Sequence, residues 1–193
     1  MSSPASANSS CENLPSKKTR HVCALGDRGV GKTAIAKMFV DSVVLDKYRP
    51  SMTNMVEGRI KYNNVIYTLK LLDTAGMDSF TPIPDEVDAT FDAFIFVFSL
   101  SDEASFRNVQ QHHRSLHDHF DNIDNISCIL VGNKSDKKAE RQVDYDDAVS
   151  LSNQWKCKYV ECCAHHEADV LKLFSTVLSV IEPSESGGSC SIL

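Results

Sequence analysis

The chain contains 193 residues, with 20 Lys and Arg residues against 26 Asp and Glu residues and a formal net charge of −6. This length favours one domain, and the acidic balance argues against a nucleic-acid partner, because nucleic-acid-binding domains are usually basic. No apolar run approaches the roughly 18 residues of a membrane span. The 7 cysteines lack C-x-x-C spacing, which indicates a reducing compartment. Without an apolar signal core near Met1, we expect a cytoplasmic protein.

Composition divides the chain into a folded body between two tails. Residues 1–18 are rich in Ser and contain a single large aliphatic residue, Leu14, so they bury too little surface to order themselves. Residues 19–182 carry the apolar patterning of a folded domain. Residues 183–193 again consist mainly of Ser, Gly, Pro and Glu before the final apolar residues. We therefore expect a domain at residues 19–182 and flexible tails at 1–18 and 183–193.

Within the body, short apolar runs alternate with amphipathic patterns. The expected elements are strand 20–25, helix 32–42, strands 55–62, 65–72 and 93–100, helix 102–120, strand 126–131, helix 145–155, strand 158–162 and a helix with an apolar stripe over 170–181. Asn63 and Asn64 mark a hairpin turn. This alternation predicts an α/β fold with about six strands in a mostly parallel sheet, one antiparallel edge strand, and helices on both faces. Ligands bind such sheets beyond the carboxyl ends of their strands.

A phosphate-binding motif follows the first expected strand. Residues 26–33 read G-D-R-G-V-G-K-T and match G-x-x-x-x-G-K-[ST] between a strand and a helix, the context that this motif requires. The glycines let backbone N–H groups surround phosphate oxygens, and the helix dipole favours the same charge. Lys32 is predicted to reach the β- and γ-phosphates, and the Thr33 hydroxyl to bind Mg²⁺. The predicted nucleotide-binding residues of this segment are Arg28, Gly29, Val30, Gly31, Lys32, Thr33 and Ala34.

A second loop, with the sequence Asp-Thr-Ala-Gly at residues 73–76, follows the third expected strand. An acidic residue at the end of a strand is where a P-loop nucleotidase places its second Mg²⁺-holding carboxylate, so Asp73 is a predicted metal ligand. Gly76 leaves a backbone N–H free to approach a γ-phosphate. Taken alone this loop is a weak signal, because Asp and Gly are common in turns.

A third polar loop, with the sequence Asn-Lys-Ser-Asp at residues 133–136, follows a buried strand. The Asp136 carboxylate is able to accept hydrogen bonds from N1–H and the exocyclic amine of guanine, a donor pair that adenine lacks. Asp136 therefore points to GTP rather than ATP. The Lys134 stem is predicted to cover one face of the base, and Asn133 to tie neighbouring loops together.

With these three loops in order, the chain resembles the Ras superfamily of small GTPases, particularly its Ras branch. The resemblance rests on residues 26–33, 46–51, 73–76, 133–136 and 161–164. It implies a P-loop NTPase fold, a small G domain, that binds GTP or GDP with Mg²⁺ and hydrolyses GTP as a monomeric switch in signal transduction. It also implies an effector that contacts residues 46–54, an exchange factor and a GTPase-activating protein.

The resemblance assigns roles to further residues. Val44 stands where the family usually has an aromatic residue that covers the base, and Tyr48 where a tyrosine closes over the phosphates. Ser51 stands where a threonine binds Mg²⁺ through its hydroxyl and the γ-phosphate through its N–H. In the loop after residue 162, the N–H of Ala164 is expected to meet the guanine oxygen. Cys163 and His165 flank Ala164 and complete the expected base site.

The residues expected to act in hydrolysis are Lys32, Gly76 and Met77, and the last departs from the family pattern. Met77 stands where the family mostly has a glutamine that orients the attacking water, and a thioether donates no hydrogen bond. Arg28 stands where Ras has glycine, although Rheb-like members also have arginine there. Its side chain either crowds the attacking water or a partner's arginine finger, or it points into solvent. These residues predict intrinsic hydrolysis slower than that of a typical Ras protein.

Two other functions remain open at the level of sequence. The first is a pseudo-GTPase, a scaffold that stays loaded with GTP or ignores nucleotide, which Met77 and Arg28 would explain. The second is a P-loop kinase, but such an enzyme needs an arginine-containing lid that the sequence does not show. It also gives no reason for the loop at residues 133–136.

The C-terminal residues predict a lipid anchor. Residues 190–193 read C-S-I-L and fit the C-a-a-X motif, with the final Leu favouring a geranylgeranyl group on Cys190. No polybasic run precedes this motif, and a single lipid without a second signal gives reversible membrane attachment. We therefore expect a cytoplasmic protein that attaches reversibly to the cytoplasmic face of a membrane. A cluster of histidines at 112–119 is interpreted as a solvated helix face.

Overall fold

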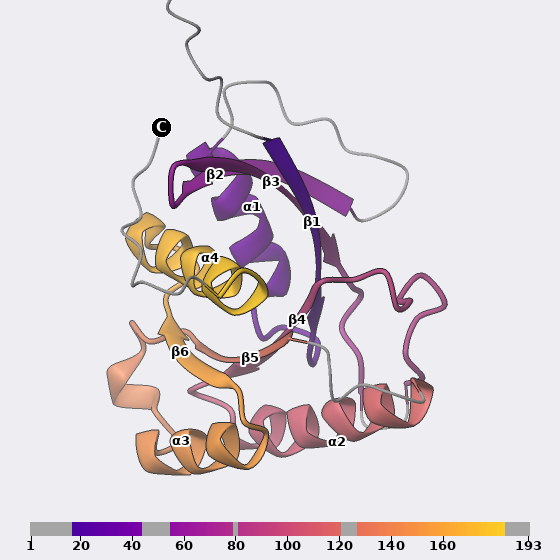
Figure 1. Ribbon diagram of the computed structural model, residues 1–193. Helices are drawn as coiled ribbons and strands as arrows, with labels where there is room; N and C mark the ends of the chain where they lie inside the picture. Colours follow the sequence, from indigo (N-terminus) through magenta and orange to yellow (C-terminus); the bar gives the residue numbers. More distant parts are fainter. Residues whose placement is uncertain (1–16, 44–54, 79–80, 121–126, 184–193) are drawn as a thin grey trace, which may run out of the picture.

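The computed structural model describes residues 17–43, 55–78, 81–120 and 127–183 (Figure 1). The elements in chain order are β1 (Lys17–Leu25), α1 (Lys32–Val43), β2 (Met55–Tyr62), β3 (Val65–Asp73), β4 (Ala93–Ser99), α2 (Glu103–His119), β5 (Ser127–Asn133), the 3-10 turn η2 (Lys138–Glu140), α3 (Tyr145–Gln154), β6 (Lys158–Cys162) and α4 (Glu167–Ile181). The predicted alternation of strands and helices is confirmed.

The strands form one sheet in the order β2-β3-β1-β4-β5-β6. Among the strands that the structure describes, only the β2–β3 pair is antiparallel, and it lies at an edge of the sheet. The other neighbouring strands run parallel. Helices α1 and α4 cover one face, and α2 and α3 cover the other (Figure 1). The fold is therefore the predicted mostly parallel α/β sheet, with the carboxyl ends of its parallel strands gathered at one edge.

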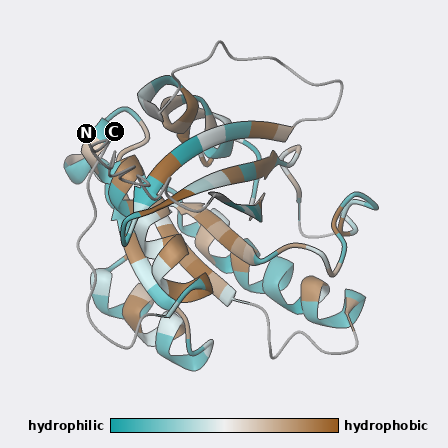
Figure 2. Cartoon of the chain, turned by 45° about the horizontal axis from the view of Figure 1, so that its top comes forward, coloured by the Kyte–Doolittle hydropathy of each residue, from teal (hydrophilic) through white to brown (hydrophobic). Residues whose placement is uncertain are grey.

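A hydrophobic core lies on each face of the sheet. On one face, the rings of Phe39 from α1 and Phe174 from α4 lie 3.9 Å apart between their centroids. On the other face, Phe94, Phe96 and Phe98 of β4 pack beneath α2 and α3. Every residue of β4 is buried, as expected for a central parallel strand covered on both sides. Figure 2 shows hydrophilic and apolar residues alternating in colour along the helices, as expected for helices with one face on a sheet.

Local signals explain several element ends. Asn63 and Asn64 both have positive φ, at 48° and 61°, which suits the tight hairpin that joins β2 to β3. Helix α2 begins after Asp102, whose carboxylate accepts hydrogen bonds from the backbone N–H groups of Ala104 and Ser105. This is the expected geometry of an N-cap. The predicted helix at 102–120 thus includes both of its capping residues.

Strand β1 begins at Lys17, earlier than the predicted residue 20. Lys18 and Arg20 both form ion pairs with the Glu182 carboxylate just after α4, and the Lys18 Nζ lies 2.8 Å from it. These pairs join the start of β1 to the end of the folded body. A pairing across 164 residues of sequence has no local signal, so the local apolar pattern alone starts this strand too late.

Helix α2 presents its histidines to different environments, not to one solvated face. His112 is 1% exposed and lies on the buried side of the helix with Ser105, Val109 and Leu116. His113 stacks on Trp155 with ring centroids 3.9 Å apart. Burial, with repulsion from His117 and Arg114, lowers the pKa of His113 to about 4. Only His117 and His119, farther along α2, are exposed as predicted.

Among the described residues, no cluster of three or more His, Cys, Asp or Glu side chains forms a metal-binding group. Within the same part of the chain, no helix combines the length and apolar character that crossing a membrane requires.

Candidate nucleotide-binding site

A hollow of about 680 Å³ lies at the carboxyl ends of β1 and β3. Its walls come from the segment at 26–34, here called the phosphate loop, from the start of α1, and from the loop after β3. The lining residues are Arg28, Gly29, Gly31, Lys32, Thr33, Ala34, Lys37, Asp73, Thr74, Ala75 and Gly76. The sequence predicted both of these loops as parts of one site. Their position agrees with the general placement of ligands on parallel sheets.

The glycines of the phosphate loop are required by its backbone. Gly31 has a φ of +105°, and a Cβ there would stand 2.1 Å from the Asn133 Nδ2. Gly26 has a φ of +148°, and a Cβ there would stand 2.1 Å from the Val97 carbonyl oxygen. Only glycine tolerates such angles and contacts. Val30 is 1% exposed and anchors the loop in the core, so only its backbone is available to a ligand.

Lys32 is almost fully enclosed by its own loop. Its side chain is 5% exposed, and Nζ donates to the carbonyl oxygens of Gly26 and Asp27 at 2.8 and 2.9 Å. Burial lowers the pKa of Lys32, while the carboxylates of Asp73 and Asp27 act in the opposite direction. The arrangement holds a cationic group at the wall of the hollow, where it is able to meet an anion.

Thr33 and Asp73 come together from the two loops as predicted. The Thr33 hydroxyl donates to Asp73 Oδ2 at 2.7 Å. The other carboxylate oxygen, Oδ1, is buried and has no hydrogen-bond partner among the described residues. A buried carboxylate oxygen without a donor is costly unless a cation satisfies it. Hard oxygen ligands are those that Mg²⁺ prefers, so this pair fits the metal.

The loop after β3 packs directly against the phosphate loop. The N–H of Met77 donates to the Gly26 carbonyl at 3.2 Å, and Met77 forms an isolated parallel bridge with Asp27. Gly76 leaves no room for a side chain, because a Cβ there would stand 2.3 Å from the Arg28 Cα. The two loops are therefore in direct backbone contact.

Met77 and Arg28 are placed very differently. Met77 is 3% exposed and packs in the core beneath α2 and α3, and it is not among the residues that line the hollow. The Arg28 side chain is exposed at the rim. Arg28 is therefore both exposed and part of the wall of the hollow, and its effect on hydrolysis stays a prediction.

Asn133 joins three loops at the expected base site. It is 1% exposed, its Nδ2 donates to the Val30 carbonyl at 2.8 Å, and its Oδ1 accepts from the Ala164 N–H at 3.1 Å. The predicted tying role is thus confirmed by two buried hydrogen bonds. The N–H of Ser135 also donates to the Cys162 carbonyl at 3.2 Å.

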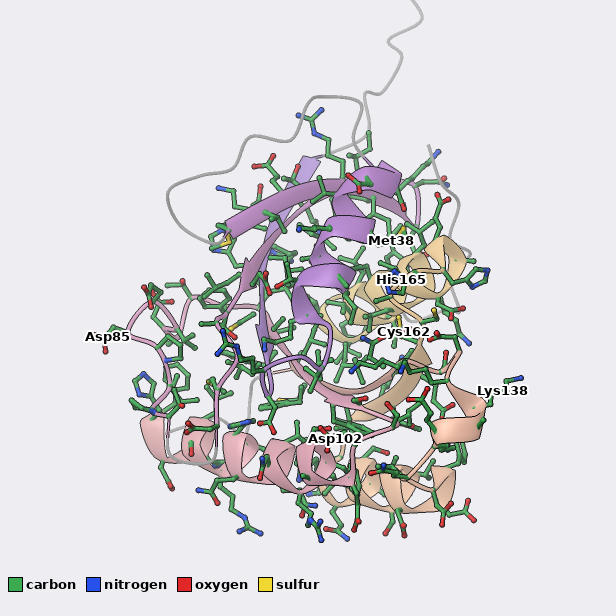
Figure 3. The ribbon with its side chains drawn as sticks, turned by 180° about the vertical axis from the view of Figure 1, so that it is seen from behind. Met38, Asp85, Asp102, Lys138, Cys162 and His165 are labelled. Atoms are coloured by element: carbon green, nitrogen blue, oxygen red, sulfur yellow. The ribbon has the colours of Figure 1, made fainter. Side chains whose placement is uncertain are left out.

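The other predicted base-site residues lie around Asn133. Lys134 adopts a positive φ of 65°, and Asp136 is exposed at the loop surface. Burial and a hydrogen bond to the Asp136 carboxylate both raise the pKa of the Cys163 thiol. Figure 3 labels Cys162 at the end of β6 and His165 in the loop that follows. His165 is exposed.

Several predicted residues lie outside the part of the chain that the structure describes. These are Val44, Tyr48, Ser51, the effector segment at 46–54 and Cys190. Their assigned roles remain predictions.

The sequence did not predict one cluster of hydrogen-bonded side chains. The Asp27 carboxylate in the phosphate loop is bonded to Asn108 and His112 of α2. The helical spacing of Ser105, Val109 and Leu116 was the available signal, because it places residue 112 on the same buried face.

The fold and the two loops around the hollow define a P-loop nucleotide-binding protein. Comparison with known proteins identifies the family within this class of nucleotide-binding proteins. The sequence model of the Ras family matches residues 21–183, and the chain therefore belongs to the Ras family.

Individual relatives are similar over nearly the whole chain. The GTP-binding protein Rheb of Homo sapiens is 29% identical over 185 residues, which cover 93% of this chain and 100% of that protein. The Rheb homolog of Dictyostelium discoideum is 29% identical over 171 residues, covering 89% and 92%. The small monomeric GTPase RhbA of Aspergillus fumigatus is 31% identical over 182 residues, covering 91% and 97%.

The chain is thus a Ras- and Rheb-like small GTPase, a GTP-binding switch that uses GTP, GDP and Mg²⁺ and has the GTP-hydrolysing activity of its family. Membership also implies effectors, exchange factors and GTPase-activating proteins in general terms. The predicted family and fold are confirmed, and the kinase alternative is not supported.

Proposed function

We propose that this chain is a signalling switch with slow intrinsic GTP hydrolysis. The observation that carries the proposal is the position of Met77. It occupies the place of the family's water-orienting glutamine, yet its side chain is buried in the core and does not line the hollow. A thioether donates no hydrogen bond, so this residue is unable to orient an attacking water.

Other residues of the site bind Mg²⁺ and the phosphates. Mg²⁺, when bound, neutralises charge on the phosphate oxygens, and Thr33, Asp73 and Ser51 are the residues that would hold it. Lys32 pairs with the β- and γ-phosphates, and the glycine-rich backbone surrounds them. This arrangement supplies tight binding and charge stabilisation even where water is poorly oriented.

The guanine end is assigned to the loops joined by Asn133. Asp136 accepts the two donors of guanine, the Ala164 N–H meets its oxygen, and the Lys134 stem covers the base. The single Ala164 N–H donates to Asn133 Oδ1 at 3.1 Å in this structure, so contact with the guanine oxygen requires this proton to be shared with, or released from, that acceptor. The effector is proposed to bind residues 46–54.

Met77→Gln is expected to raise the intrinsic hydrolysis rate by about tenfold. A polar amide is unfavourable in the core that buries Met77, so it turns toward the hollow, where a positioned hydrogen-bonding group is worth about 10²–10³-fold in other enzymes. Single-turnover hydrolysis of preloaded GTP measures the rate. Met38→Gln, on α1 and partly buried against the opposite core, is the matched control and should leave the rate unchanged. A Met77→Gln rate equal to that of the wild type would mean that Met77 does not limit hydrolysis.

A constitutively GTP-loaded scaffold is the competing function, because Met77 would equally explain a protein that almost never hydrolyses GTP. The nucleotide that copurifies with the chain from cells separates the two. Mostly GDP supports a cycling switch, whereas mostly GTP supports the scaffold.

We also propose a prenyl group on Cys190 that attaches the protein reversibly to the cytoplasmic face of a membrane. Cys190→Ser should move the chain from the membrane fraction to the soluble fraction of cell lysates. Cys11→Ser, in the other tail, is the matched control and should fractionate like the wild type. Unchanged fractionation of Cys190→Ser would remove the lipid anchor from the proposal.

A further inference from the structure

The phosphate loop carries an acidic side chain at its first variable position. Asp27 follows Gly26 directly, and its side chain is 15% exposed. A carboxylate this close to a phosphate site repels the ligand if it turns toward the phosphates, so its orientation matters. Two side chains of α2 hold it by hydrogen bonds, because Asn108 Nδ2 donates to Oδ2 and His112 Nε2 lies against Oδ1, each at 2.7 Å.

The geometry of α2 suits this task. Asn108 and His112 are four residues apart, so they lie one above the other on the same face of the helix. A carboxylate accepts hydrogen bonds and donates none, so the Nε2–H of His112 is the donor. Both oxygens of Asp27 are thus held by one rigid helix, with His112 itself 1% exposed.

The backbone of Asp27 makes contacts of its own. Its carbonyl accepts from the Lys32 ammonium at 2.9 Å, and the residue bridges to Met77 of the neighbouring loop. The next residue, Arg28, lies against Gly76. One residue therefore links α2, the phosphate-binding lysine and the loop after β3.

We propose that Asn108 and His112 are positioning residues, which hold the phosphate loop through Asp27 in the conformation that receives the terminal phosphate of GTP. The proposal rests on GTP binding at this site and is independent of how slowly the chain hydrolyses GTP. Asp27 touches the loop that carries Gly76 and Met77, whereas the guanine end is organised around Asn133. Loss of the link therefore weakens GTP more than GDP.

His112→Leu tests the link by removing the donor while keeping an apolar side chain in the buried position. Dissociation rates of a fluorescent GDP and of a fluorescent non-hydrolysable GTP analogue are measured at fixed Mg²⁺. The dissociation rate of the GTP analogue should rise about tenfold, as expected for the loss of a hydrogen bond to a charged group. The dissociation rate of GDP should rise by less than about threefold. His119→Leu, on the exposed part of the same helix, should change neither rate.

Two further variants separate positioning from general stability. His112→Gln keeps an N–H donor at a similar reach and should restore most of the slow GTP-analogue release. Asp27→Ala combined with His112→Leu should release the analogue no faster than the faster of the two single variants, since both remove the same link. Asn108→Ala, at a partly buried position, tests the same link if His112→Leu fails to fold.

Equal acceleration of GDP and GTP-analogue release, without rescue by His112→Gln, would overturn the proposal and leave His112 a structural residue. Unchanged release in both His112→Leu and Asn108→Ala would overturn it as well. A wild-type chain that bound no guanine nucleotide would overturn GTP binding itself, and the control measurement on the wild type detects that failure separately.

Discussion

Asn133→Ala is expected to weaken GTP binding by about 100-fold. The substitution leaves the Val30 carbonyl and the Ala164 N–H without the partners that they have at 2.8 and 3.1 Å. Each buried polar group left unpaired costs about 1–3 kcal/mol, and both groups belong to loops of the nucleotide site. Equilibrium titration with labelled GTP and GDP measures the loss, which should be similar for the two nucleotides because the defect lies away from the γ-phosphate.

Asn153→Ala, at an exposed position of α3, is the matched control and should bind both nucleotides like the wild type. Asn133→Asp separates the contributions of the two hydrogen bonds, since a carboxylate still accepts from the Ala164 N–H but has no donor for the Val30 carbonyl. Wild-type affinity in Asn133→Ala would contradict the idea that this one side chain holds the three loops together.

Local patterns were sufficient to predict most of the fold. The unbroken apolar run of β4 reflects burial on both faces of the sheet. The apolar stripe of α4 reflects burial that repeats at the helical period. The Asn63–Asn64 turn has a purely local cause. The pairing of Thr33 with Asp73 was also predictable, because both residues end up at the carboxyl edge of one parallel sheet.

Contacts between distant segments were not predictable in this way. The link from Asp27 to His112 joins residues 85 apart in sequence, and it depends on the position of α2 across β4. The burial of Met77 depends likewise on the path of the loop after β3 into the core. Sequence patterns identify which residue types are present, but the orientation of a single side chain is decided by its tertiary neighbours.

Gly76→Ala is expected to weaken binding of a GTP analogue by about tenfold or more, with a smaller loss for GDP. The added Cβ would stand 2.3 Å from the Arg28 Cα and 2.7 Å from its backbone nitrogen. Backbone atoms are unable to turn aside as a flexible side chain does, so the loop after β3 must move away from the phosphate loop. Such overpacking costs about 1–3 kcal/mol, and it displaces the N–H proposed to meet the γ-phosphate.

The ratio of the dissociation constants for the GTP analogue and GDP is the informative measurement for Gly76→Ala. Gly187→Ala, in the C-terminal tail, controls for the substitution itself and should leave this ratio unchanged. An equal loss for both nucleotides would place the damage in the fold and not at the terminal phosphate. Arg28→Gly should restore little of the loss, because it removes the Arg28 Cβ but leaves the two backbone atoms that the new methyl group meets. A full rescue by Arg28→Gly would show instead that side-chain crowding, and not backbone contact, separates the two loops.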